Sequence, residues 1–186
     1  MPSTSFPMET VRLLLRPFEE DDFDALFELR SSPDVTRYIY WGPESEPEVR
    51  DALAKRIASR AIEVEGDVIG LAVVRKGAGD MIGDIILRFV SAEHRTAELG
   101  FIVHPRHHGR GYATEAGHRM LGVAFDDLQM HRVIGRTEAR NVASARVLEK
   151  LRMRREAHFV ENEFVKGEWQ SELVFAILDR EWRADR

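Results

Sequence analysis

The stretch from Val103 to Glu115 decides the fold, and it reads V-H-P-R-H-H-G-R-G-Y-A-T-E. An apolar, β-branched segment runs into this stretch, and apolar or small residues at helical spacing follow it from Tyr112 onward. The pattern predicts a strand, a loop with glycines at positions 109 and 111, and a helix that begins directly after the loop. Glycines let the backbone approach a ligand closely, and the free N–H groups of a first helical turn attract anions. We therefore expect an anion site here, most naturally for phosphate.

Positive charge gathers in this loop although the protein as a whole is acidic. Arg106, His107, His108 and Arg110 lie within it, whereas 27 Lys and Arg against 32 Asp and Glu give a net charge of −5. Proteins that bind nucleic acid through its phosphates are normally basic, so nucleic-acid binding is disfavoured. The local contrast favours a small anionic ligand.

Two common phosphate motifs do not fit the loop. A P-loop requires Gly-Lys-Ser/Thr at the turn, and a dinucleotide fingerprint requires three glycines early in a parallel βαβ unit. Here the turn reads Gly-Arg-Gly-Tyr-Ala and follows a segment of short hairpins. A glycine-containing helix start that binds no ligand remains an alternative.

Length and composition are those of one globular domain. The 186 residues are 44% hydrophobic, so we expect a single domain over residues 1–186, with residues 1–10 as a loose lead-in. The absence of cysteine excludes disulfide scaffolds, thiol nucleophiles and cysteine-ligated metals. No apolar run approaches the roughly 20 residues of a membrane span, and no signal-peptide pattern is visible. We expect a cytosolic protein with no metal, no membrane and no nucleic acid among its partners.

Periodicity predicts a mixed sheet with helices on both faces, an α/β (α+β) fold of about seven strands. Connections within residues 68–103 are short enough to allow only antiparallel hairpins. Helices are expected from Phe23, over 47–60, from Tyr112, and after Asn141 as the helix cap. Strands are expected over 11–16, 68–76, 81–91, 96–103, 132–137, 157–165 and 171–178, with a further strand considered at 61–65.

An aromatic stretch at Tyr38, Tyr40 and Trp41 lies between two predicted helices. Such loops carry function more often than cores do, so these side chains are candidates for the wall of a substrate pocket. Packing of the following helix onto the sheet would require similar residues, and the sequence leaves both readings open.

Several motifs resemble one family, the GNAT superfamily of acyl-CoA-dependent N-acetyltransferases. His108-x-x-Gly111-x-Ala113 is similar to its Gln/Arg-x-x-Gly-x-Gly/Ala signature, and the run from Gly109 to Ala116 resembles the ribosomal-protein-alanine N-acetyltransferase branch. Further resemblances occur in the family's order at 12–17 (RLLLRP), 98–101 (ELGF), 141–151 (NVASARVLEKL) and 166–169 (KGEW). They span almost the whole chain.

The resemblance implies a sheet splayed between the family's fourth and fifth strands, with acetyl-CoA as co-substrate. It implies that the acetyl-CoA arm pairs with Ile102 and Val103 and forms a hydrogen bond with Asn141. Partners would be an amine acceptor, either a peptide N-terminus or a small amine, and we include a homodimer among them. The pyrophosphate would lie on the loop and helix start, at His108, Gly109, Arg110, Gly111, Tyr112, Ala113 and Thr114.

The sequence departs from the family pattern at the residue expected to protonate the thiolate and at the first residue of the signature. Leu148 stands where many members have a tyrosine that protonates the departing thiolate, and His108 stands where the signature prefers Gln or Arg. In the branch resembled here the serine of Asn-x-x-Ser is the substitute, so Ser144 is the candidate acid; its alternative role is that of an ordinary first-turn serine. These departures support a second hypothesis, a non-catalytic acyl-CoA-binding or regulatory module with the same fold.

Acetylation of an amine also requires a base, because the attacking nitrogen must lose its proton. An α-amine has a pKa of about 7.7–8.0, so at neutral pH a modest base acting through water is sufficient. Glu98, on the strand beside the expected thioester, is our candidate, with His104 and His107 as rivals. A solvent-facing Glu98 paired with Arg95 is the alternative. Carboxylates of the closing hairpin, Glu161 and Glu163, would suit a cationic acceptor if they line the pocket.

Overall fold

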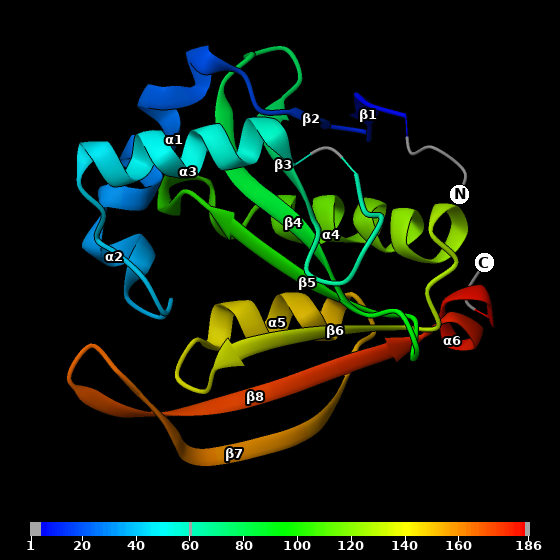
Figure 1. The fold of residues 1–186 in the computed structure, drawn as a ribbon. Helices are drawn as coiled ribbons and strands as arrows, with labels where there is room; N and C mark the ends of the chain where they lie inside the picture. Colours follow the sequence, from blue (N-terminus) through cyan, green and yellow to red (C-terminus); the bar gives the residue numbers. More distant parts are fainter. Residues whose placement is uncertain (1–4, 60, 185–186) are drawn as a thin grey trace.

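One mixed sheet of eight strands organises the protein (Figure 1), whose computed structural model describes residues 5–59 and 61–184. The strand order is β1-β2-β3-β4-β5-β6-β8-β7, and every neighbouring pair is antiparallel except β5 and β6, which are parallel. This confirms the expected fold class. The strands are β1 (Met8–Glu9), β2 (Leu13–Pro17), β3 (Val68–Arg75), β4 (Met81–Ser91), β5 (Thr96–Val103), β6 (Arg132–Glu138), β7 (Arg154–Val165) and β8 (Glu168–Leu178).

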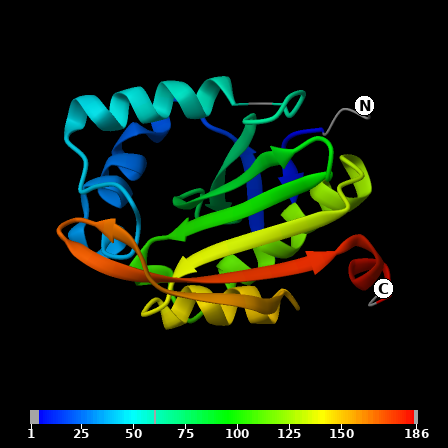
Figure 2. The same cartoon turned by 60° about the horizontal axis from the view of Figure 1, so that its bottom comes forward.

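Helices cover both faces of the sheet, and Figure 2 shows α3 and α5 on opposite sides of it. Among the residues described, no helix is long and apolar enough to cross a membrane. The helices are α1 (Phe23–Ser31), α2 (Pro33–Thr36), α3 (Glu46–Ala58), α4 (Tyr112–Gly122), which continues into a π-helical turn (Val123–Asp127), α5 (Val142–Lys150) and α6 (Asp179–Ala184).

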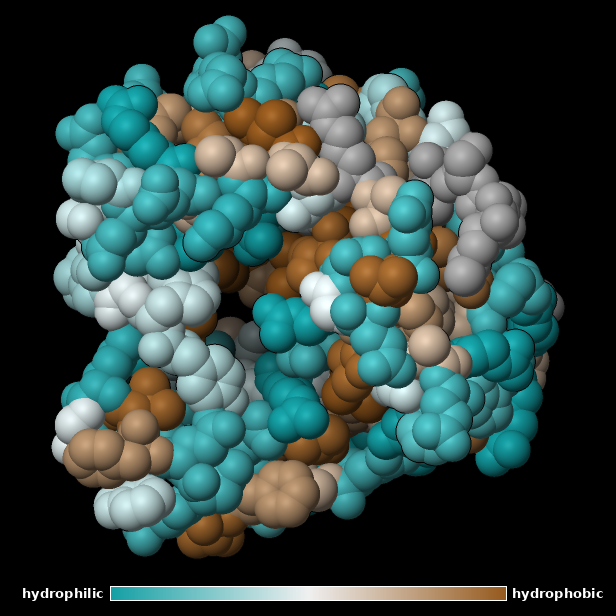
Figure 3. All heavy atoms as spheres, in the orientation of Figure 1, coloured by the Kyte–Doolittle hydropathy of each residue, from teal (hydrophilic) through white to brown (hydrophobic). Residues whose placement is uncertain are grey.

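Two hydrophobic cores of unequal extent hold these layers together. The larger lies between the sheet and α4 and α5, and includes Leu99 of β5 and Phe175 of β8, both buried. The smaller lies under α1 and α3, where Leu53 packs near Ala72 and Val74 of β3. The smaller core does not extend beyond the first half of the sheet. On the face that α3 covers, β6 and β8 carry polar side chains such as Arg136 and Glu172. Figure 3 shows that this face is hollowed in the region where β5 and β6 separate.

Two expectations about the first half of the chain need correction. The lead-in expected over residues 1–10 contains β1, whose Met8 is buried in the larger core; residues 1–4 lie outside the described part of the chain. The strand considered at 61–65 is wrong. There the Asp67 carboxylate accepts N–H bonds from Glu63 and Val64, both at 2.8 Å, and these local bonds fold the segment into a turn.

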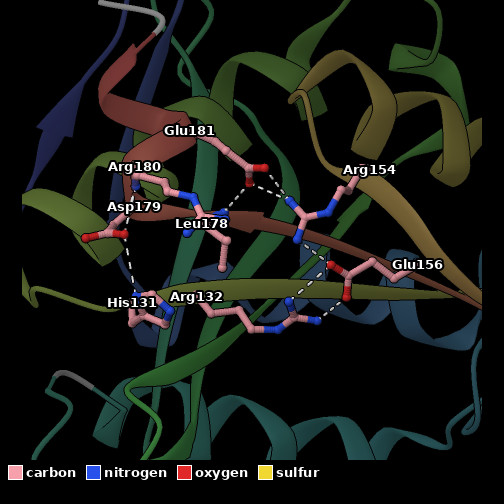
Figure 4. Close-up of polar contacts among 8 residues, drawn as sticks. All are labelled: His131, Arg132, Arg154, Glu156, Leu178, Asp179, Arg180 and Glu181. Carbon is pink, nitrogen blue, oxygen red and sulfur yellow. Dashed lines mark hydrogen bonds and ion pairs between the residues drawn. The ribbon is translucent and has the colours of Figure 1, made fainter.

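An ion-pair network fixes the end of the sheet where β5 and β6 are still paired (Figure 4). Arg132 of β6 and Arg154 of β7 both bind the Glu156 carboxylate, and Arg154 also binds Glu181 of α6 at 2.5 Å. Glu181 in turn accepts the Leu178 N–H at 2.8 Å. The network thereby ties the beginnings of β6 and β7 to the end of β8, and the hydrogen bond from Arg132, opposed by burial, lowers the pKa of Glu156.

Replacing Glu156 with Gln tests this network. Because the pKa of Glu156 is lowered in the folded protein, its charge stabilises the fold above the ordinary value of 4.5, and the stabilisation is lost as pH falls through the lowered pKa. We expect Glu156→Gln to reduce the free energy of unfolding by about 0.5–1 kcal/mol at pH 7, and the difference from wild type to vanish in acid. Urea unfolding across this pH range measures it, with Glu93→Gln in an exposed turn as control. A deficit that does not depend on pH would contradict the assignment.

Candidate active site

The site is built on β5, because the two edges of this strand differ. One edge pairs with β4 along its whole length, from Thr96 to Val103. The other edge pairs with β6 only from Thr96 to Glu98, opposite Arg132 to Ile134. Beyond Glu98 the backbone of β5 therefore has a free edge that an extended ligand can bind through main-chain hydrogen bonds. This separation is the splay that the family resemblance implied.

Ile102 and Val103, which were expected to pair with the acetyl-CoA arm, lie at the open end of this edge. The Val103 carbonyl oxygen already lies 2.7 Å from Nε2 of His108. Since a carbonyl can only accept, Nε2 is the donor and carries the proton. His108 thus holds the loop back against the strand that precedes it.

The loop after β5 has the geometry of an anion site. Gly109 and Gly111 have φ values of +72° and +79°, in the left-handed region that favours glycine. The first helical hydrogen bond of α4 runs from the Glu115 N–H to the Gly111 carbonyl at 3.0 Å. The N–H groups of Tyr112, Ala113 and Thr114 precede this bond, so they have no acceptor within the helix.

Arg12, just before β2, holds this loop in position. Its Nε and Nη2 lie 2.7 and 2.6 Å from Oε2 of Glu115, and its Nη1 donates to the Arg110 carbonyl at 2.9 Å. The guanidinium also lies 4.7 Å from the centre of the Tyr112 ring. Burial acts to raise the pKa of Glu115, but hydrogen bonds from Thr10 and Arg12 outweigh it and lower the pKa. Arg12 therefore offsets a carboxylate that would otherwise repel phosphate at the start of α4.

The positive cluster expected in the loop is smaller than the sequence suggests. Arg106 forms an ion pair with Glu28 of α1, and Nε2 of His104 lies 3.4 Å from the same carboxylate. Burial, together with the nearby Arg75 charge, lowers the pKa of His107. Among the described residues no carboxylate forms an ion pair with Arg110. The loop charge that remains for a ligand is that of Arg110.

Asn141 and Ser144 lie at the start of α5, with Asn141 acting as the cap. Its Oδ1 accepts the Ser144 N–H at 3.1 Å, which confirms the predicted cap. Ser144 is half-buried, whereas Leu148, one turn further on, is buried in the larger core. A Cβ added to Gly135 of β6 would lie 2.6 Å from Cδ2 of Leu148, so this position of α5 packs tightly onto the sheet.

Glu98 and Ser144 approach the splay from opposite faces of the sheet. Glu98 pairs in register with Arg88 of β4, which lines a cavity with residues of α3, so both side chains lie on the α3 face. The helix carrying Ser144 packs on the other face, where Leu99 belongs to the larger core. A group bound between β5 and β6 would therefore have Glu98 on one side and α5 on the other.

The two aromatic residues at the end of the loop after α2 make different contacts. Tyr40 donates from its hydroxyl to Oε1 of Glu172 in β8 at 3.1 Å, and Nζ of Lys166 donates to the Thr36 carbonyl at 2.6 Å. Trp41 instead stacks on Arg30, with the guanidinium 3.8 Å from its ring centre. These contacts join the α2 region to the β7–β8 hairpin. Trp41 lines the cavity beneath α3, whereas Tyr40 is exposed.

Glu172 was missed by the sequence analysis, which named Glu161 and Glu163 instead. Its side chain is buried, and Arg136 of β6 lies 3.3 Å from its second oxygen. Burial, followed by hydrogen bonds to Glu163 and Glu172, raises the pKa of Tyr40. Glu163 thus lies beside Tyr40, whereas Glu161 is exposed at a bulge. The signal for Glu172 was its position in alternation with Gln170, directly before the apolar run from Leu173 to Leu178.

Comparison with known proteins gives the family. The chain matches the family model described as an acetyltransferase (GNAT) domain over residues 12–154. The chain belongs to the GNAT acetyltransferase family. An uncharacterized N-acetyltransferase of Bacillus subtilis, YnaD, is 32% identical, covering 93% of this chain and 97% of the relative.

Solved structures agree with this assignment. The crystal structure of a GNAT-family acetyltransferase from Bacillus anthracis has a TM-score of 0.85 and 32% identity, covering 95% of this chain and 100% of that one. A spermidine N-acetyltransferase from Vibrio cholerae, in complex with CoA and spermine, has a TM-score of 0.79 and 25% identity. The match covers 94% of this chain and 99% of that one. The protein is therefore an N-acetyltransferase that uses acetyl-CoA.

Proposed function

We propose that this GNAT enzyme transfers acetyl directly from acetyl-CoA to a primary amine while both are bound at the splay of β5 and β6. The observation that carries the proposal is the short β5–β6 pairing, which ends at Glu98, next to a glycine loop and a helix start with unused N–H groups. The acceptor would be a small amine or, by resemblance to the ribosomal-protein-alanine branch, a peptide N-terminus.

The donor would bind along β5 and onto α4. Its pyrophosphate would accept hydrogen bonds from the backbone of Gly109 to Thr114, with Arg110 as the nearby charge. Its arm would lie against Ile102 and Val103, and the free edge of β5 would supply an N–H to the thioester carbonyl, where negative charge develops during attack. Asn141 would contact the arm through its amide nitrogen, since its oxygen already caps α5.

Proton transfers would run through the two faces of the sheet. Glu98, through water, takes a proton from the ammonium, and the neutral nitrogen then attacks the thioester carbon. A C–N bond forms, the C–S bond breaks, and the nitrogen, now positively charged, releases its second proton to solvent to give the neutral amide. Ser144 donates a proton to the thiolate and regains one from solvent. The products are the acetylated amine and CoA with a free thiol. Thiol release from acetyl-CoA with N-terminal peptides, polyamines, amino acids and aminoglycosides tests the function, and no release with any of them would contradict it.

Arg12→Met tests the position of the pyrophosphate. Without the Arg12 bonds to Glu115 and Arg110, the loop is no longer held in position and the Glu115 carboxylate has no positive partner. We therefore expect the KM for acetyl-CoA to rise by roughly 10- to 100-fold. Acetyl-pantetheine carries the same thioester and arm without the pyrophosphate and provides the control. Its kcat/KM should change by less than about threefold. An equal loss of kcat/KM with acetyl-CoA and with acetyl-pantetheine would contradict a role of Arg12 in binding the pyrophosphate.

Glu98→Gln tests the base. A glutamine cannot accept the proton, so turnover at neutral pH should fall, by about 100-fold if the full effect of a general base is lost. It should recover partly as pH rises, because free amine then accumulates without help. The pH–rate profile of the variant measures this. A profile that coincides with that of wild type would remove Glu98 from the mechanism.

Ser144→Ala tests the acid. A free thiol has a pKa of about 8.5, so the CoA thiolate is a fair leaving group and its protonation assists the reaction without being essential. We expect kcat to fall by roughly ten- to a thousandfold while the affinity for acetyl-CoA stays nearly unchanged. Steady-state kinetics and calorimetry provide the two readouts. An unaltered kcat would mean that water or substrate supplies the proton.

A further inference from the structure

A cavity of about 380 Å³ lies beneath α3, on the face of the sheet that carries Glu98. It extends from the aromatic loop after α2 to the middle of β4, and its lining is almost entirely charged. Among the residues that line it are Trp41, Glu44, Glu48, Asp51, Lys55 and Arg88.

Arg88 brings this cavity next to the proposed base. It is the register partner of Glu98 on the neighbouring antiparallel strand. Directly opposed residues of such strands have Cβ atoms about 4.5–5.5 Å apart and project from the same face. A molecule whose amine lies at Glu98 can therefore place a second group, one or two bonds away, at Arg88.

Arg88 differs from the other arginines of the cavity, because no carboxylate of the described residues forms an ion pair with it. Arg30 binds both oxygens of Glu44, at 2.6 and 2.7 Å. Arg56 donates two bonds to Asp84, at 3.0 and 2.8 Å. Within residues 5–59 and 61–184, no carboxylate forms an ion pair with Arg88, whose side chain is exposed to the cavity side of the sheet.

We propose that Arg88 binds a carboxylate of the acceptor, and that the acceptor is a free amino acid. This inference rests on the proposed function and names the substrate class of the same site. The planar guanidinium matches a carboxylate in two parallel hydrogen bonds, and Lys55 adds a second positive charge to the same cavity. In an α-amino acid one carbon separates the amine from the carboxylate, which suits the adjacent positions of Glu98 and Arg88.

The same geometry disfavours two other acceptor classes. A polyamine has no carboxylate for Arg88, whose guanidinium would repel it, although Glu48 and Asp51 of the same lining would attract its amines. A peptide N-terminus has a neutral amide where the amino acid has its carboxylate, and this leaves Arg88 without a partner. The acceptor preference of the wild-type enzyme therefore distinguishes the three classes.

Thiol release from acetyl-CoA, measured with matched acceptors, tests the proposal. The standard amino acids are compared with their carboxamides, N-terminal dipeptides and spermidine. We expect the best amino acid to exceed its carboxamide in kcat/KM by roughly 10- to 100-fold, the effect of charge-assisted hydrogen bonds. Arg88→Gln should lose this preference because the KM for the amino acid rises. The kcat/KM for the carboxamide should change by less than about threefold. Arg88→Lys should restore part of the preference, and Lys150→Gln, on the exposed side of α5, is the matched control.

The outcomes separate this inference from the function on which it rests. A wild-type preference for spermidine, carboxamides or dipeptides overturns the amino-acid assignment and leaves acetyl transfer intact. Equal losses of Arg88→Gln for acid and carboxamide overturn the role of Arg88. Absence of thiol release with every amine overturns the proposed function itself. If Arg88→Gln does not fold, the wild-type comparison of acid with carboxamide still decides.

Discussion

The parallel pairing of β5 with β6 is the interaction on which the rest of the structure depends, because it stops after three residues. Two strands that continued in register would bury their edges in a complete ladder and leave no place for a ligand. Here the ladder ends at Glu98 and Ile134, so the backbone of β5 keeps an open edge in the middle of an otherwise continuous sheet. This edge lies directly before the glycine loop and α4. An extended ligand that binds along the edge therefore reaches the anion site at the start of α4.

Side-chain contacts surround both ends of this separation. At the paired end, the network of Arg132, Arg154 and Glu156 ties β6, β7 and α6 together. At the open end, Tyr40 and Lys166 join the α2 region to the β7–β8 hairpin across the mouth of the hollow. The network at the paired end joins elements on the β6 side of the splay only, whereas Tyr40 and Lys166 bridge its two sides at the open end.

The sequence revealed those parts of the site whose signals are local. The glycines at 109 and 111, the start of α4 at Tyr112 and the cap at Asn141 are each determined by residues within one turn, and the structure places them as predicted. Contacts between distant parts of the chain left no such signal. The clamp of Arg12 on Glu115 joins residues 103 positions apart, and the Glu28 carboxylate that neutralises Arg106 comes from α1. Such pairings depend on how the layers pack, and they reduced the positive cluster that the loop sequence suggested.

Hydrogen–deuterium exchange with and without CoA tests the central claim most directly, because it follows the backbone groups themselves. The account predicts slower exchange on CoA binding in peptides that cover residues 99–103 and 109–115, where free N–H groups gain acceptors. Peptides from β7, at the far edge of the sheet, should exchange at unchanged rates. CoA binding that protects other segments and leaves both of these regions unaltered would contradict the placement of the donor in the splay of β5 and β6.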